Sequence, residues 1–208
     1  PRDERGRFGE GGGDGGGVGE GSGGVGEYRK ITAANQAKFS KRESEDLASL
    51  KANEKAALKG YTADEGVGNY NEINGGLRSG NTQGIASRVE AMDRAIAKGS
   101  LDEPTLVYRG FSGDSLPSDD LTGAVVSDRA YLSTSVDRSE ASRFAGSDGT
   151  VAEMRLPKGT PGLWLGGEAA LSEFGSEGEF LMGRNSKFKV ITDSRIGGQR
   201  SLTLEAIP

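Results

Sequence analysis

Hydrophobic residues are spaced in two different ways along the chain, and the spacing changes about halfway along it. In the first half, apolar side chains recur every three or four residues, as at Ile85, Val89 and Met92. This spacing places them on one face of a helix. In the second half, short runs of alternating apolar and polar residues are separated by turn residues, a pattern typical of strands. We therefore expect helices over about 31–101 and a β-core over about 105–208.

The second half predicts a series of short strands with one helix among them. Helices followed by strands are typical of an α+β domain, in which a helical layer packs on a compact, antiparallel β-core. The expected helix is Arg138–Ala145. The expected strands are Leu106–Phe111, Gly123–Val126, Tyr131–Ser135, Val151–Leu156, Gly162–Leu165, Glu179–Gly183, Phe188–Thr192 and Leu202–Ile207.

Two places in the first half have the spacing of a helix-capping box. Ser40 stands three residues before Glu43, and Thr62 stands three residues before Glu65. In such a box the hydroxyl group and the carboxylate each accept a hydrogen bond from a backbone N–H group in the first turn. We therefore expect one helix to begin near Ser40 and another near Thr62.

The N-terminal segment differs in composition from the rest of the 208 residues. Much of the glycine, 35 residues in the whole chain, falls before Tyr28, where apolar side chains are few. Such a segment buries too little apolar surface to offset the entropy lost on ordering. We expect 1–30 to be a disordered, Gly-rich linker or tail, and 31–208 to be one domain. Because the chain begins with Pro1, we also expect it to be a piece of a longer polypeptide.

Charge and missing residue types narrow the possible functions. A net charge of −5 argues against nucleic-acid binding driven by overall charge. The chain has neither cysteine nor histidine, which excludes disulfides, cysteine nucleophiles, Ser-His-Asp hydrolysis and zinc sites built on histidine or thiolate. An enzyme with this composition must use carboxylates, arginine, lysine, hydroxyl groups and the backbone.

Three short motifs in the second half carry groups suited to chemistry. Arg109 lies near the end of an expected strand, and the hydroxyl triplet Ser133–Ser135 ends another. Farther along, Glu177 and Glu179 are two residues apart, which places both carboxylates on one face of an extended segment. Two acids this close resist joint ionisation, so such a pair commonly meets a cation or takes part in a reaction.

In this order, the three motifs resemble those of the mono-ADP-ribosyltransferases of the arginine-modifying, toxin-like class, which includes the iota-toxin-like exoenzyme domains. The resemblance runs from about residue 56 to residue 207. It implies the ADP-ribosyltransferase fold, with two small sheets facing each other around a cleft. It also implies NAD as substrate, no metal, and an arginine-bearing target protein of a host.

The resemblance assigns different roles to the two glutamates. Glu179 would stabilise the positive charge that develops on the ribose when the bond to nicotinamide breaks, as carboxylates do in glycosidases. Glu177 matches the family position that selects the acceptor, and its carboxylate can pair with the guanidinium group of arginine. Phe174, in the loop before the pair, would contact the acceptor protein.

Other residues would hold NAD or order the site, according to the same resemblance. Arg109 would grip the phosphates, and Ser133 would hold the catalytic glutamate and the nearby ribose. Gly110 would let the ligand approach the backbone closely. The further candidates for contact with NAD are Thr134, Ser135, Phe144, Tyr70, Asn74 and Arg78. For two of them an ordinary role stays open: Phe144 as a core residue and Arg78 as half of an ion pair.

The sequence leaves two alternatives to the transferase hypothesis. An NAD glycohydrolase would share the NAD site and use water as the acceptor. A structural or delivery module is the other alternative, because Arg2–Phe8 and the glycines after it look like a linker of phage head-assembly proteins. The resemblance thus implies either a secreted effector or a virion-associated protein that acts in the host cytoplasm, with nucleic acid the less favoured acceptor.

Overall fold

The structure of the protein is a computed structural model. It describes residues 9–10, 28–31, 36–63, 66–165, 178–196 and 198–208. Most of the expected linker, 1–30, therefore lies outside the described residues.

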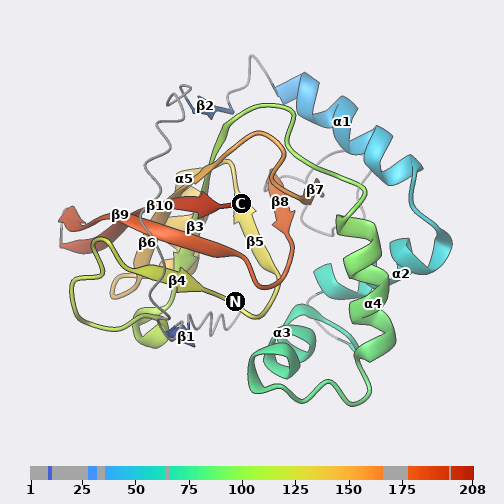
Figure 1. Cartoon of the computed structure of the whole chain (residues 1–208), viewed down its shortest axis with the longest axis horizontal. Coiled ribbons are helices and arrows are strands. Elements are labelled where there is room, and N and C mark those ends of the chain that lie inside the picture. The colour runs from blue at the N-terminus through green and yellow to red at the C-terminus, as the bar shows by residue number, and fades with distance from the viewer. Residues whose placement is uncertain (1–8, 11–27, 32–35, 64–65, 166–177, 197) are drawn as a thin grey trace, which may run out of the picture.

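Four helices precede the main strands in the described part of the chain, in the region where the sequence predicts them (Figure 1). They place apolar side chains in the core at helical spacing, for example Val89, Met92 and Ile96. No described helix has the length and apolar character that crossing a membrane would require. The helices are α1 (Gln36–Ala48), α2 (Ala52–Thr62), α3 (Tyr70–Ser79) and α4 (Ala86–Ile96).

Both helix starts that we expected from capping boxes are wrong. Ser40 lies within α1, and Thr62 is the last residue of α2. The N-cap of α3 is instead Asn69, whose side-chain oxygen accepts a hydrogen bond of 3.0 Å from the backbone N–H of Glu72. Capping-box spacing alone did not locate these helix starts, because such residue pairs also occur inside and at the ends of helices.

The expected strands and the expected helix are all present in the second half of the chain, with ends that shift by a few residues. The helix α5 (Arg138–Ala145) has the bounds that the sequence predicts. The main strands are β3 (Thr105–Phe111), β4 (Val125–Ser127), β5 (Leu132–Ser135), β6 (Thr150–Leu156), β7 (Gly162–Trp164), β8 (Glu179–Met182), β9 (Lys187–Ile196) and β10 (Gln199–Ile207). Two short strands, β1 (Gly9–Glu10) and β2 (Arg29–Lys30), precede the helices.

The strands form one hydrogen-bonded series in the order β1-β4-β9-β10-β6-β3-β5-β8-β7, with β2 paired to β3. Most neighbouring strands are antiparallel, as expected, but β10 runs parallel to β6 and β2 runs parallel to β3. Alternating hydrophobicity shows which face of a strand is buried but not the direction of its neighbour. The pairing between β3 and β5 is short: these strands are joined through the single residue pair Tyr108 and Ser135.

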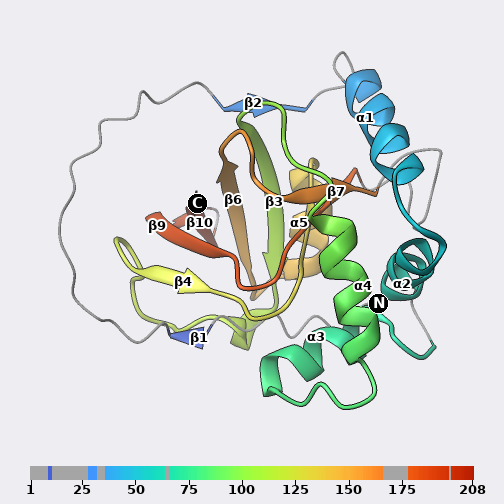
Figure 2. The same cartoon turned by 45° about the vertical axis from the view of Figure 1, so that its right-hand side comes forward.

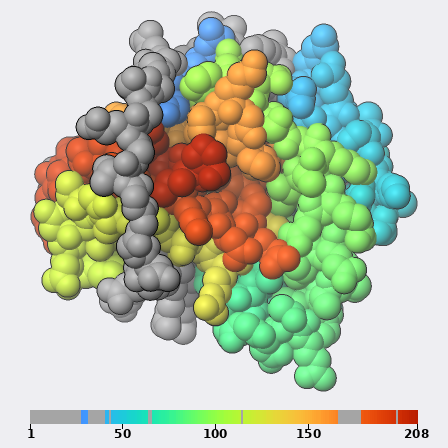
Figure 3. Space-filling model, in the orientation of Figure 1, coloured from blue at the N-terminus to red at the C-terminus, as the bar shows by residue number. Residues whose placement is uncertain are grey.

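Two main hydrophobic clusters fill the protein. One lies between the strands themselves, around Phe111, Phe180 and Phe188. The other joins the four helices to β7, β8 and the residues just before β5, and the helices lie beside this end of the sheet in both views (Figures 1 and 2). The space-filling view shows the helical and strand surfaces in continuous contact (Figure 3). The second cluster includes Leu58, Ile73, Met92, Leu163 and Leu181.

Helix α5 packs tightly on β3, and Gly110 makes this contact possible. A Cβ atom at Gly110 would lie 2.0 Å from the carbonyl oxygen of Ala141 and 2.7 Å from the backbone nitrogen of Ala145. On this side of the strand α5 fills the space beside Gly110, and the expectation that a ligand approaches the backbone here stays a prediction. Close packing of helix against strand accounts for the glycine.

We predict that Gly110→Ala destabilises the protein by about 3 kcal/mol, since the added methyl group has to push α5 away from β3. Urea unfolding followed by circular dichroism measures this change. Gly75→Ala is the matched control, because a Cβ atom there meets nothing within 4 Å on helix α3. We expect the control to be stabilised by about 0.5–1 kcal/mol. Equal stabilities for the two variants would contradict the packing argument.

Candidate functional site

The structure brings the arginine, the serine triplet and the second glutamate together at neighbouring strands. Ser135 on β5 pairs directly with Glu179 on β8 and also with Tyr108 on β3. Arg109 follows Tyr108 on the same strand. Residues that are far apart in the sequence therefore meet at the narrow junction of β3, β5 and β8, as the order of motifs led us to expect.

The side chains of Ser133, Ser135 and Glu179 share one face of this part of the sheet. Side chains two apart on a strand lie on the same face, and directly paired residues of antiparallel strands also share a face. Leu181, which pairs with Ser133, belongs to the hydrophobic cluster that includes the helices. The candidate catalytic face is therefore turned toward the helical part of the protein, and Glu179 is only 5% exposed.

Thr134 lies on the opposite face from the two serines. It is buried, and its hydroxyl group donates a hydrogen bond of 2.8 Å to the backbone oxygen of Phe180 on β8. The hydroxyl group of Thr134 therefore serves the sheet itself, and the expectation that Thr134 contacts NAD stays a prediction. Strand alternation, applied to the triplet, separates the middle residue from its two neighbours.

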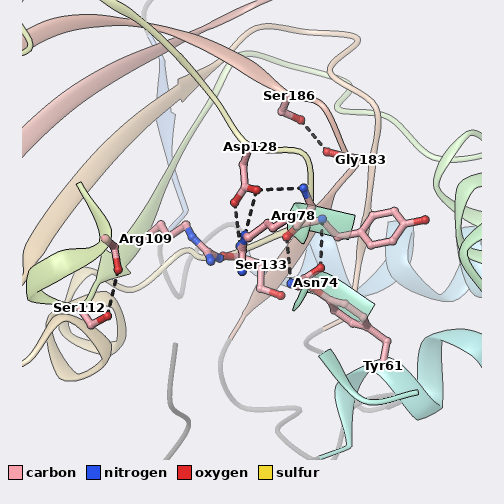
Figure 4. Close-up of polar contacts among 12 residues, drawn as sticks. Tyr61, Asn74, Arg78, Arg109, Ser112, Asp128, Ser133, Gly183 and Ser186 are labelled. Carbon is pink, nitrogen blue, oxygen red and sulfur yellow. Dashed lines mark hydrogen bonds and ion pairs between the residues drawn. The ribbon is translucent and has the colours of Figure 1, made fainter. Parts of the chain in front are cut away.

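Arg109 is a buried arginine that reaches from β3 to β5. One of its terminal nitrogens donates a hydrogen bond to the backbone oxygen of Ser133 (Figure 4). The centre of its guanidinium group also lies 5.3 Å from the centre of the Phe111 ring, within the range of a cation–π contact. In this structure Arg109 thus braces the strand that carries the serines.

Helix α3 contributes Tyr70, Asn74 and Arg78, which are spaced four residues apart and so lie along one face. Tyr70 is part of the core. Asn74 is buried, and its amide is fixed at both ends by the backbone of Tyr131: its oxygen accepts from the N–H group at 3.2 Å, and its nitrogen donates to the carbonyl group at 3.3 Å. The same nitrogen donates to the hydroxyl group of Tyr61 at 3.0 Å.

Arg78 forms an ion pair with Asp128. This is the ordinary role that the sequence left open for it beside contact with NAD. The Nε and one terminal nitrogen of Arg78 donate to the two carboxylate oxygens at 3.1 and 2.7 Å. Asp128 is fully buried as a side chain and also accepts from the backbone N–H of Ala130. The pair ties α3 to the loop that leads into β5.

Tyr61 is a site residue that our sequence analysis did not identify. It lies in the last turn of α2, is 1% exposed, and its hydroxyl group accepts a hydrogen bond of 3.0 Å from the side-chain nitrogen of Asn74. Burial, together with the negative charge of Glu179, raises the pKa of Tyr61 to about 12, although the neighbouring side chains of Asn74 and Ser133 and the charge of Arg109 act to lower it. From the sequence, Tyr61 is indistinguishable from a core aromatic residue on an apolar helix face.

The remaining predicted site residues lie on α5 and in the segment before β8. Phe144 lies on α5, half-buried, with its Cβ next to Gly110. Glu177 and Phe174 fall in 166–177, outside the described residues. The described residues contain no group of three or more acidic side chains that could hold a metal ion.

The site combines a buried glutamate, the serine-bearing strand with which it pairs, and an arginine that braces that strand. Such a site is suited to stabilising positive charge on a bound sugar. Comparison with known proteins assigns it to a class: residues 36–207 match the ADP-ribosyltransferase exoenzyme family. The chain belongs to this family, whose members use NAD as their substrate.

Individual relatives agree with this assignment. The NAD(+)-arginine ADP-ribosyltransferase EFV of Enterococcus faecalis is 30% identical over 154 residues, which cover 69% of this chain but only 30% of that protein. C3stau2 of S. aureus, solved with NAD, has a TM-score of 0.74 at 19% identity, over 88% of this chain and 99% of that one. Plx2a, a toxin of Paenibacillus larvae, has a TM-score of 0.68 at 23% identity, over 83% and 94%.

The pKa of Tyr61 leads to a prediction about stability at high pH. In the unfolded chain a tyrosine loses its proton near pH 10, whereas folded Tyr61 keeps it to about pH 12. Between these values the unfolded state binds fewer protons, so the free energy of unfolding falls as the pH rises. Between pH 9.5 and 11.5, we expect the free energy of unfolding to fall on the order of 1–2 kcal/mol more in wild type than in Tyr61→Phe. Urea midpoints of both proteins at each pH measure this; parallel losses would contradict it.

Proposed function

We propose that this protein is a mono-ADP-ribosyltransferase that cleaves NAD at the bond between nicotinamide and ribose and transfers ADP-ribose to arginine on a target protein. The observation that carries the proposal is the direct pairing of Ser135 with Glu179, beside a strand that Arg109 braces. It is supported by the Glu177-Gly178-Glu179 motif and by a relative whose name includes arginine as the acceptor.

Glu179 has the burial and surroundings that the first step of this reaction needs. When the bond from ribose C1′ to the ring nitrogen breaks, its electron pair leaves with nicotinamide and positive charge develops on the sugar. A carboxylate that is fixed in a site with little water stabilises this charge more strongly than one in solution. Ser133, on the same face, would orient the carboxylate and a ribose hydroxyl group.

Glu177 would take part in the second step. A guanidinium nitrogen of the acceptor arginine attacks C1′, a carbon–nitrogen bond forms, and the nitrogen gives up a proton. A carboxylate can hold the guanidinium group through paired hydrogen bonds and accept that proton. Because Glu177 stands two residues before Glu179 in the sequence, it is close enough along the chain for both to act on one bound NAD.

We predict that Glu179→Gln lowers the rate of NAD cleavage at least a hundredfold, because the amide removes the negative charge and keeps the shape. Release of nicotinamide from NAD measures the rate. Glu205→Gln, a half-buried strand position away from the serine face, is the control and should keep wild-type activity. A Glu179→Gln protein with the wild-type rate would refute the assignment of Glu179.

For Glu177→Gln we expect transfer to agmatine, a small guanidinium acceptor, to fall at least tenfold while hydrolysis of NAD by water continues. The physical reason is that an amide neither balances the guanidinium charge nor accepts its proton. Labelled NAD distinguishes the products, ADP-ribosyl agmatine and free ADP-ribose. If wild type produces only free ADP-ribose with agmatine and with mixed proteins, the chain is an NAD glycohydrolase instead.

We further infer that the target belongs to another organism, because several structural relatives are named as toxins. Action in the cytoplasm of a host follows from this inference. The proposed association with a phage particle rests only on the short match of Arg2–Phe8 to head-assembly linkers. Sequencing the gene around the segment that encodes this chain tests it: a capsid-assembly domain would support the association, and a secretion or translocation domain would oppose it.

A further inference from the structure

Residues 128–131 connect two distant strands of the sheet and lead directly into β5. β4 ends at Ser127, and the pairing of β5 with β8 begins at Leu132. In the sheet, β4 and β5 are separated by β9, β10, β6 and β3. The backbone between them leaves one pair of strands before it reaches the next, so its N–H and C=O groups need other partners. Two side chains of α3, those of Arg78 and Asn74, hold this segment.

The first contact is the ion pair between Arg78 and Asp128 (Figure 4). The Asp128 side chain is 0% exposed, and its two oxygens accept from Arg78 at 3.1 and 2.7 Å. One of these oxygens also accepts from the backbone N–H of Ala130 at 2.9 Å. The carboxylate therefore joins the helix to the backbone of its own segment. Because a buried charge that gave up these partners would be costly, the contact fixes the segment firmly.

The second contact lies one turn earlier on α3. The side-chain amide of Asn74 accepts from the N–H group of Tyr131 at 3.2 Å and donates to its carbonyl group at 3.3 Å. Both backbone groups of one residue are thus bound from the same side, as a neighbouring antiparallel strand would bind them. Asn74 is itself buried. At the start of β5, α3 therefore takes the place of a paired strand.

These contacts act on the candidate catalytic face through the backbone of β5. Tyr131 directly precedes this strand, and Ser133 is two residues farther on. The Ser133 carbonyl group accepts from Arg109, and Ser135 pairs with Glu179 on β8. Because the spacing of residues along a strand is nearly constant, a displacement at Tyr131 is carried to the serine positions. The anchoring of residues 128–131 therefore bears on the geometry of this face.

We infer that Asp128 is a positioning residue for cleavage of NAD: its ion pair with α3 anchors the start of β5 and so fixes where Ser133 and Ser135 lie beside β8. The inference rests on the proposed function. A reacting group that is misplaced by about 1 Å can lose roughly a hundredfold in rate, so this anchor affects catalysis without touching the substrate. Such an effect appears in kcat, whereas loss of a direct contact between Arg78 and NAD would raise KM.

Asp193 provides a closely matched control. Its carboxylate accepts from the Nε and one terminal nitrogen of Arg200 at 3.0 and 2.5 Å, and from the backbone N–H of Leu121 at 3.0 Å. The side chain is only 8% exposed. Asp128 and Asp193 thus have the same three kinds of hydrogen-bond donor. Asp193, however, lies on β9 and Arg200 on β10, which β6 and β3 separate from β5.

The test compares Asp128→Asn with Asp193→Asn in the complete chain. Each change keeps the shape of the side chain and leaves a partly buried arginine without its carboxylate, so both variants should melt several degrees below wild type. Nicotinamide release is measured over a range of NAD concentrations, at a temperature where circular dichroism shows all three proteins folded. We expect kcat to fall roughly tenfold or more in Asp128→Asn, with KM for NAD within about twofold, and both constants to stay within about twofold in Asp193→Asn.

Asn74→Ala tests the same anchor independently, since it removes the contact with Tyr131 and leaves the Asp128 ion pair in place. We expect the same signature, a kcat lowered roughly tenfold with KM within about twofold. If Asp128→Asn does not fold, this second variant decides. An Asn74→Ala protein that raises KM and keeps the wild-type kcat would assign Asn74 to contact with NAD and would oppose the inference.

The remaining outcomes separate this inference from the proposed function. A wild-type protein that cleaves NAD, together with equal kcat values in Asp128→Asn and Asp193→Asn, overturns the role of Asp128 and leaves the proposed function intact. An Asp128→Asn protein in which only KM rises also overturns it, because the ion pair would then act on bound NAD through Arg78. A wild-type protein that does not cleave NAD overturns the proposed function and this inference with it.

Discussion

Among the described strands, β3 and β5 share the shortest pairing, and the site depends on the contact that reinforces it. A single residue pair joins the two strands. Arg109 adds a second link, from its guanidinium group to the backbone oxygen of Ser133. Because β5 carries the serines and pairs with the strand of Glu179, a shift at this junction would move every group on the candidate catalytic face. Arginine suits this position, since its charge does not depend on pH and its planar group can donate to several acceptors.

Burying a carboxylate is costly, and the surroundings of Glu179 show how this protein meets the cost. Ser135 on β5 pairs with Glu179, and the positive charge of Arg109 and the negative charge of Glu179 act in opposite directions on the pKa of Tyr61. Buried charges in proteins are generally held by such polar partners. A site without histidine thus combines a buried acid with hydroxyl groups and an arginine.

The sequence predicted the elements of this fold better than their arrangement. Period-two and period-four patterns located the strands and helices, because burial of one face leaves a repeat in the sequence. The parallel pairing of β10 with β6 leaves no such repeat. At the site, the motifs indicated Arg109, Ser133 and Glu179, which the structure brings to neighbouring strands. The sequence did not indicate Tyr61 and Asp128, since their contacts join segments distant in sequence. Nor did the motif alone show that the Thr134 hydroxyl group donates to the neighbouring strand, because it was considered without strand alternation.

The position of β10 has a consequence for how the protein is made. This strand, Gln199–Ile207, lies in the interior of the sheet between β9 and β6, although it follows all the other described strands in the sequence. During synthesis β6 therefore lacks its second neighbour until residue 207 has left the ribosome. The half of the sheet that supports β3, and through it Arg109, is completed only then. Folding to an active form must accordingly follow translation of this domain, and shortening the domain by even one strand at this end would open the sheet at its middle.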